Sequence, residues 1–282
     1  MNFRLVFRNN LALEFNRLLY IDRSFVIVNK PSGFVTQYPG DGQTEAVAEL
    51  VGPIPSVPST TNVFPVHRLD KGTTGCLIFA RSPNHAHTLS RQLQQRTVHK
   101  TYHVLINTSS NPALTKEDSG CVRVGMSLKN GRPHISQSKS ARETWTDWQV
   151  VGSSSQSDVA LVKLRLYTGM KHQLRVHMSD ILKAPILGDL QHAGTQTSTP
   201  RSLSIPNDRL FLHASEVSFH RFKRTGKRLN LTIRAPLPSD FMELCTRIGI
   251  EVPSYLEEGG LFIDGQPMRE VPDLDGHWLH SS

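Results

Sequence analysis

The stretch Val66–Arg81 reads V-H-R-L-D-K-G-T-T-G-C-L-I-F-A-R and joins a crowded polar loop to an apolar run. Its second part, Gly75–Arg81, is short and apolar, which is typical of a buried β-strand. The start signal Ser82–Asn84 follows, and His85–Gln95 then carries apolar residues at helical spacing. The predicted local order is therefore strand and then helix, with Asp70 placed just before the strand begins.

Most other periodic segments favour strands. Apolar runs and period-two alternation predict strands, a period near 3.6 predicts a helix, and a basic turn between two runs predicts a hairpin. Strands are expected at Phe25–Val28, Lys100–Ile106, Val159–Leu166, Val217–Phe219 and Leu229–Ile233, and a helix at Gln173–Leu182.

We expect one α+β domain, built around a largely antiparallel β-sheet flanked by helices and loops. It is expected over residues 18–248, between an N-terminal extension of residues 1–17 and a C-terminal tail of residues 249–282. The tail is interpreted as a peripheral appendage. Two segments rich in small and polar residues, 109–140 and 188–208, are interpreted as loops or a small inserted hairpin.

Composition indicates the class of partner. The 282 residues include 32 Lys and Arg against 24 Asp and Glu, a formal net charge of +8, which points to a polyanion. Recurrent apolar clusters exclude disorder throughout, and no apolar run approaches the ~20 residues that span a bilayer. Three separated cysteines suggest neither a disulfide framework nor a cysteine zinc site, and they fit a reducing compartment.

The first nineteen residues contain Arg4, Arg8 and Arg17 against a single acid, Glu14. This acid-poor, basic bias is typical of a mitochondrial presequence. The interleaved apolar residues are equally typical of an ordinary first strand, so both interpretations stay open.

Three clusters could carry chemistry. Asp70 lies among cations that would keep it ionised as a nucleophile or base, although a turn aspartate that stabilises its own loop is the simpler alternative. Lys171, His172 and Arg175 fall at the start of the second predicted helix, where an anion is favoured unless these residues are merely solvated. The basic turn 220–228 is either solvated or a contact for a nucleic-acid backbone.

Five blocks occur along the chain: IVNKPSGF, HRLDKGTTG, KTYHVLI, LYTGMKHQLRVHM with PILGD, and LHASEVSF with RAPLPSDF. In this order they resemble the motifs of the RluA-type pseudouridine synthases. Those motifs are V-x-N-K-P-x-G, H-R-L-D-x-x-T-S-G, K-x-Y-x-x-x-V, T-G-R-x-H-Q-I-R-V-H with P-I-x-G-D, and L-H-A with A-P-L-P-x-D-F. The resemblance covers about residues 18–245 and implies the pseudouridine synthase fold.

The resemblance also implies an activity, the conversion of a uridine in RNA to pseudouridine without a cofactor. Asp70 matches the catalytic nucleophile, whose attack at C1′ or at C6 stays open. Tyr102 matches the tyrosine that stacks on the target base and is placed to take the C5 proton. Arg175 matches the arginine that pairs with the nucleophile, and a bidentate guanidinium would keep Asp70 charged and aimed.

The remaining implied contacts are with RNA. Arg68 matches the arginine that fills the space left when the target nucleotide is turned out of its stack. Weaker candidates for phosphate contacts are the basic residues near the motifs and in the 220–228 turn. They are Lys30, Lys71, Lys171, Arg221, Lys223 and Arg224.

The chain departs from the family pattern at two positions. Met170 stands where the family commonly has Arg, so one phosphate or loop contact is expected to be lost or shifted to Lys171. Thr74 replaces the usual Ser and keeps the hydroxyl. Because the family-like region starts near Leu18, we expect no N-terminal S4 RNA-binding module. We therefore expect the RNA to be selected by the catalytic domain, by the tail or through the shape of the target.

We expect a monomer that acts on RNA and has no membrane partner. Ribosomal RNA is favoured, with a mitochondrial large-subunit rRNA as the leading target; transfer RNA and a cytoplasmic location are the alternatives. A catalytically idle RNA-binding or ribosome-assembly factor with the same fold is the main rival function. A metal-dependent nuclease or hydrolase that uses histidines with Asp70 or Asp189 is the third hypothesis. His85 and His87 are the only close pair of histidines in the sequence, and no suitably spaced carboxylate or third ligand accompanies them.

Overall fold

The computed structural model describes residues 17–36, 63–114, 118–193, 198–200, 203–206 and 208–280. The N-terminal extension of residues 1–17, for which a presequence and a first strand both stay open, therefore lies outside the described residues apart from Arg17.

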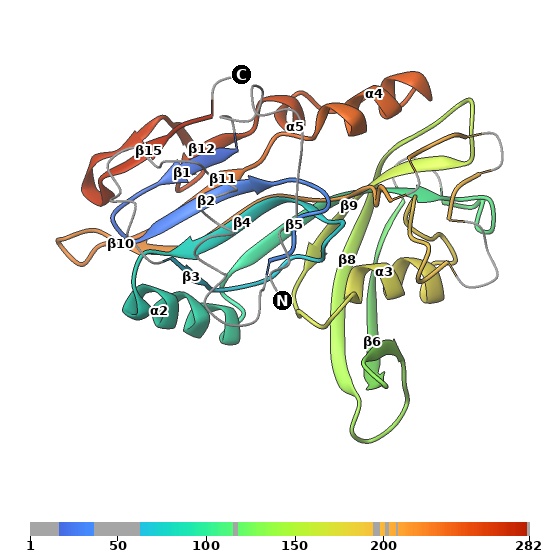
Figure 1. The fold of residues 1–282 in the computed structure, drawn as a ribbon, viewed down its shortest axis with the longest axis horizontal. Coiled ribbons are helices and arrows are strands. Elements are labelled where there is room, and N and C mark those ends of the chain that lie inside the picture. The colour runs from blue at the N-terminus through green and yellow to red at the C-terminus, as the bar shows by residue number, and fades with distance from the viewer. Residues whose placement is uncertain are drawn as a thin grey trace, which may run out of the picture.

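The described strands form one sheet (Figure 1). Its order is β14-β15-β1-β2-β4-β10-β5-β9-β8-β6-β7; β11 pairs with β10 and β12, β13 with β12, and β3 with β4. The strands are β1 (Leu18–Ile21), β2 (Phe25–Lys30), β3 (Phe64–Pro65), β4 (Thr74–Ala80), β5 (His99–Asn107), β6 (Ser119–Lys129), β7 (Arg132–Ile135), β8 (Arg142–Ser153), β9 (Val159–Leu166), β10 (Leu212–Phe222), β11 (Arg228–Arg234), β12 (Gly260–Ile263), β13 (Gln266–Met268), β14 (Glu270–Val271) and β15 (Gly276–Trp278).

Few helices accompany the sheet, as predicted. In Figure 1, α2 lies below the sheet, α3 lies beside β8 at the right, and α4 and α5 lie above the sheet. The helices are α2 (Pro83–Gln94), α3 (Gln173–Val176), the π-helix η1 (His177–Ile181), α4 (Ser239–Arg247), α5 (Tyr255–Glu258) and the 3₁₀-helix η2 (Pro272–Leu274). No helix among the described residues is long and apolar enough to cross a membrane.

The stretch that opens this account folds as its pattern predicts. All seven residues of β4 are buried, and α2 begins where Ser82 caps the backbone N–H of His85 with Pro83 in the first turn. Among the described strand pairs, that of β4 with β10 is parallel and the others are antiparallel. The largely antiparallel sheet is thus confirmed.

The first of the two low-periodicity segments contains a hairpin rather than only loops. Strands β6 and β8 pair over eight residue pairs, from Ser119 with Gln149 to Met126 with Arg142, and β7 folds back on β6. Figure 1 shows this hairpin extending away from the body of the molecule beyond α3. We call residues 119–149 the arm.

The C-terminal tail is not a peripheral appendage, and that expectation was wrong. Strand β12 pairs with β11, and β15 pairs with β1, so the tail extends the sheet at two places. Leu256, Leu261 and Leu274 are buried in the apolar cores. Burial of these alternating apolar residues outweighs the acids that made the segment look solvated.

Candidate active site

The loop between β3 and β4 holds Asp70 in a turn that several backbone contacts define. The Thr73 N–H donates to the Asp70 carbonyl at 3.0 Å, and the Lys71 carbonyl accepts from Gly33 N–H at 2.9 Å and from Lys30 Nζ at 3.0 Å. The Asp70 side chain is 21% exposed, so its carboxylate is positioned by the loop yet remains open to a ligand.

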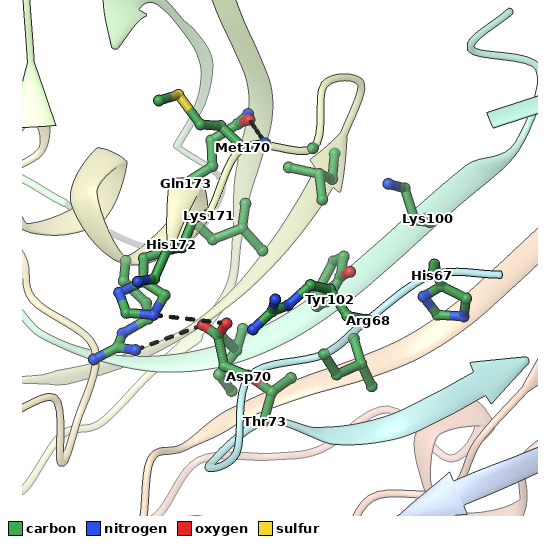
Figure 2. A pocket seen from close by; sticks show the side chains of 16 residues that line it. His67, Arg68, Asp70, Thr73, Lys100, Tyr102, Met170, Lys171, His172 and Gln173 are labelled. Carbon is green, nitrogen blue, oxygen red and sulfur yellow. Dashed lines mark hydrogen bonds and ion pairs between the residues drawn. The ribbon is translucent and has the colours of Figure 1, made fainter. Parts of the chain in front are cut away.

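A cavity of about 220 Å³ opens beside this carboxylate (Figure 2). Asp70 comes from the β3–β4 loop, Tyr102 from β5 and Arg175 from α3, and all three line the cavity. The three residues that the resemblance assigned to catalysis, which are far apart in sequence, are therefore brought together.

Arg175 faces Asp70, but the two side chains do not form the bidentate pair that was expected. Its Nε and Nη2 donate to the two carboxylate oxygens of Asp189 at 2.8 and 2.7 Å, and its Nη1 lies 3.5 Å from Asp70 Oδ2. Burial alone would raise the pKa of Asp189, but its hydrogen bonds with Arg175 outweigh burial and hold that pKa below its usual range. The guanidinium is thus fixed by Asp189 and presents one remaining donor to Asp70.

His172 also faces this carboxylate, and Figure 2 shows its ring directed toward Asp70. Its Nε2 is 3.7 Å from Asp70 Oδ1, and its Nδ1 is 2.8 Å from Nε2 of His192. The sequence placed His172 only in a general anion site and did not identify His192.

Tyr102 is buried at the edge of the core and lines the cavity. Burial raises the pKa of its phenol, and the charge of Asp70 adds to this effect, so the phenol is protonated at neutral pH. A protonated, apolar-packed ring is suited to stack on a base.

Lys100 is a residue of the cavity that the sequence prediction missed. It lies two residues before Tyr102 on β5, and the period of two could have indicated that both side chains share one face of the sheet. Burial lowers the pKa of Lys100 to about 8. Nearby His67 is neutral, because burial and then Lys100 lower its pKa to about 3, and its Nε2 accepts the Ile78 N–H at 3.0 Å.

The RNA-binding candidates fall into two groups. Arg68 and Lys171 line the cavity, and Lys71 is exposed on the same β3–β4 loop as Arg68. Lys171 also donates to the Gly131 carbonyl of the arm at 2.9 Å, which joins the arm to the start of α3. These three cations therefore lie in or close to the cavity that contains Asp70.

Lys30 and Arg221 belong to the second group, because each is turned inward. Lys30 is fully buried, and its ammonium donates to the carbonyls of Pro31, Phe34 and Lys71, so it organises the Asp70 loop and is not open to phosphate. Arg221 is buried against Asp22 at 2.8 Å. The expectation of phosphate contacts was wrong for both, because burial excludes the phosphate.

Lys223 and Arg224 lie in the β10–β11 turn, at the end of the sheet remote from α3 (Figure 1). Lys223 Nζ is 2.6 Å from Asp273, and Arg224 Nη2 is 3.5 Å from Asp275. The acids of the folded tail therefore offset the charge of this turn, which the sequence pattern could not reveal.

The two departures from the family pattern leave Asp70 untouched. Figure 2 shows Met170 directed away from Asp70, with its backbone N–H donating to Gln173 Oε1 at 3.1 Å. Thr74 Oγ1 lies 2.9 Å from Nδ1 of His213, so the retained hydroxyl has a buried partner.

The metal hypothesis receives no supporting geometry in the described part of the chain. No three His, Cys, Asp or Glu side chains there are grouped so as to hold an ion. His85 instead contacts the hydroxyls of Ser24 and Ser82 at 3.1 and 2.9 Å.

Comparison with known proteins agrees with this geometry. A family model described as RNA pseudouridylate synthase matches residues 24–180. The mitochondrial pseudouridylate synthase RPUSD4 of Mus musculus is 29% identical over 288 residues, which cover 89% of this chain and 74% of that protein. The tRNA pseudouridine synthase C of Yersinia pestis is 31% identical over 224 residues, which cover 77% of this chain and 85% of the relative.

A solved structure is similar as well. Human RNA Pseudouridylate Synthase Domain Containing 4 matches with a TM-score of 0.63 at 26% identity, covering 84% of this chain and 94% of that chain.

Proposed function

Because the chain belongs to the RNA pseudouridylate synthase family, we propose that it isomerises a uridine of a structured RNA to pseudouridine with Asp70 as its nucleophile. The observation that carries this proposal is the convergence of Asp70, Tyr102 and Arg175 on one cavity. A loop-fixed carboxylate beside a guanidinium and a stacking ring suits covalent attack on a turned-out nucleotide.

The reaction conserves every atom. The bond between N1 and C1′ breaks, the uracil turns, and a bond forms between C5 and C1′; C5 loses its proton and N1 gains one. Attack by the Asp70 carboxylate at C1′ or at C6 carries the intermediate, and both routes need an ionised carboxylate. Arg175 stabilises that charge through Nη1, and Tyr102 stacks on the base with its phenol protonated.

The RNA backbone is proposed to follow the cations around the cavity. Arg68 fills the space of the extruded nucleotide, and Lys71 and Lys171 contact neighbouring phosphates. The contact of Lys171 with Gly131 places the exposed Lys129 and Arg132 of the arm beside this route, so we add them as phosphate contacts.

The favoured target is a ribosomal RNA of the mitochondrial large subunit, modified by a monomeric enzyme. A relative whose name places it in mitochondria supports the location, whereas another is named for tRNA, so tRNA and the cytoplasm are the alternatives.

Tritium release from C5-labelled uridine tests the activity and the target together. Purified wild type and Asp70→Ala are each incubated with cellular and with mitochondrial RNA. We expect wild type alone to release tritium, from the mitochondrial pool, and RNA binding to survive in the variant because the phosphate contacts lie elsewhere. Release from no pool would contradict the proposal and favour an idle RNA-binding factor.

A further inference from the structure

Two histidines outside the catalytic set form a chain that ends at Asp70. His172 has a left-handed backbone conformation with φ of 53° at the start of α3. That conformation places its ring between Asp70 and His192, whose ring is nearly perpendicular to it at 87°. A non-glycine residue held in this region of φ and ψ is worth a functional explanation.

His192 is held by the same residue that holds Arg175. Its backbone N–H donates to Asp189 Oδ1 at 3.1 Å, and its carbonyl accepts from the Ser179 hydroxyl. Asp189 therefore anchors, through Arg175 and through His192, both groups that face the nucleophile. The contacts form a closed ring that runs from Asp189 through Arg175, Asp70, His172 and His192 and back to Asp189.

Hydrogen-bonding rules select one tautomer for each of these two histidines. An ionised carboxylate only accepts, so the Nε2 that faces Asp70 is favoured in its N–H form. Nδ1 of His172 is then the acceptor, and His192 Nε2–H must donate to it. Burial lowers the pKa of His172 to about 4 against the opposing charge of Asp70, and Arg175, His192 and Lys171 add to the lowering. Burial likewise lowers the pKa of His192, so both rings are neutral at neutral pH.

We propose that His172 is a positioning residue which donates its Nε2–H to Asp70 in the RNA complex, with its tautomer set by His192. The inference rests on the proposed function and deepens it. The 3.7 Å separation in the free protein is too long for a hydrogen bond, but such contacts commonly tighten when substrate closes a site. Each carboxylate oxygen then has one donor, since Arg175 faces Oδ2 and His172 faces Oδ1.

A neutral donor has a chemical advantage over a second cation at this position. Another positive charge would stabilise the carboxylate further and weaken it as a nucleophile, whereas a neutral N–H fixes the direction of the oxygen at lower cost to reactivity. The pairing thus separates charge stabilisation, by Arg175, from orientation, by His172.

A double-mutant cycle in single-turnover tritium release tests the proposal. His172→Ala should lower the rate constant roughly 10- to 150-fold, as expected for a lost hydrogen bond to a charged group, with RNA affinity unchanged. His172→Gln should recover part of the rate through its amide N–H. His192→Phe alone should lower the rate constant less than His172→Ala does. In the His172→Ala background it should lower the rate constant no further, because His192 acts through His172. His87→Ala, on the exposed side of α2, is the matched control.

A second measurement does not depend on activity. Nitrogen NMR of the full-length protein, labelled with ¹⁵N at histidine, should show His172 as the Nε2–H tautomer, and His192→Phe should shift it toward a mixture. A wild-type rate in His172→Ala, additive losses in the cycle, or an Nδ1–H tautomer of His172 would each overturn the inference. Absence of tritium release by the wild type would contradict the proposed function, while the tautomer would still test the histidine chain.

Discussion

Lys30, Lys100 and Lys171 lie in one part of the molecule, yet their ammonium groups have three different environments. Lys30 is fully buried and donates to three carbonyls, Lys100 lines the cavity beside Tyr102, and Lys171 is exposed at the cavity rim. The sequence identified Lys30 and Lys171 as equivalent phosphate contacts and missed Lys100. Residue type alone could not separate them, because burial depends on tertiary neighbours.

The lowered pKa of Lys100 predicts a pH-dependent effect on stability. Between pH 8 and about 10.5 the unfolded chain binds more protons at this lysine than the folded one, so the contribution of Lys100 to stability rises with pH across that window. Lys100→Met removes this half-buried charge, and the free energy of unfolding of the variant relative to wild type should be higher at pH 7 than at pH 10. Urea unfolding at the two pH values measures this difference.

The exposed Lys129 provides the matched control, because its ammonium keeps its water shell. Lys129→Met should change the free energy of unfolding equally at the two pH values. An equal change in Lys100→Met as well would show that folding does not lower the pKa of Lys100.

At the scale of elements, the join between the Asp70 loop and β4 depends on one glycine. Gly75 has φ of +106°, and a Cβ added there would overlap the backbone carbonyl of Ala214 on β10. This close approach is where β4 and β10 pair in parallel, with Gly75 opposite Ala214. The conformation that only glycine adopts readily thus places the Asp70 loop at the cavity.

Gly75→Ala should destabilise the fold strongly. Backbone strain costs roughly 1–3 kcal/mol, and the overlap with β10 adds a cost of similar size. Gly169→Ala is the control, since that glycine has an ordinary φ and its added Cβ would meet only the end of the Lys100 side chain at 3.6 Å. Thermal or urea unfolding should separate the two variants, and similar midpoints would contradict the described pairing.

Elements whose local signals agree were predictable from the sequence. The strand at Gly75–Arg81, the capped helix after Ser82 and the hairpin of β10 and β11 follow from apolar periodicity, caps and a basic turn. The helix from Gln173 was predicted, but its second part is a π-helix, in which the Leu182 N–H donates to the His177 carbonyl at 3.1 Å. Periodicity does not distinguish these two helix types over so few residues.

On the scale of the whole molecule, the C-terminal tail is where the structure differs most from the sequence prediction. It adds strands to the sheet, buries apolar residues and supplies the acids that face the β10–β11 turn. The ion pair between Asp273 and Lys223 depends on the tertiary fold, and no local sequence signal indicates it. The meeting of Asp70, Tyr102 and Arg175 at one cavity, by contrast, could be predicted, because each lies in a family-like block.

A pair of leucine substitutions tests whether the tail is part of the core. Leu274 is fully buried, and Leu274→Ala should lower the free energy of unfolding by about 2–5 kcal/mol. Leu279 is 38% exposed, and Leu279→Ala should have a much smaller effect. If the two variants unfold at the same urea concentration, the tail does not contribute to the cooperative core.

The most direct test of the central claim is single-turnover tritium release by Asp70→Asn on a defined target RNA, with RNA affinity measured beside it. Asparagine keeps the size of the side chain but removes the nucleophilic charge that Arg175 and His172 face. If Asp70 is the nucleophile, Asp70→Asn should release no detectable tritium and should bind RNA with an affinity close to that of wild type. Release at a rate near that of wild type would contradict the assignment of Asp70 as the nucleophile.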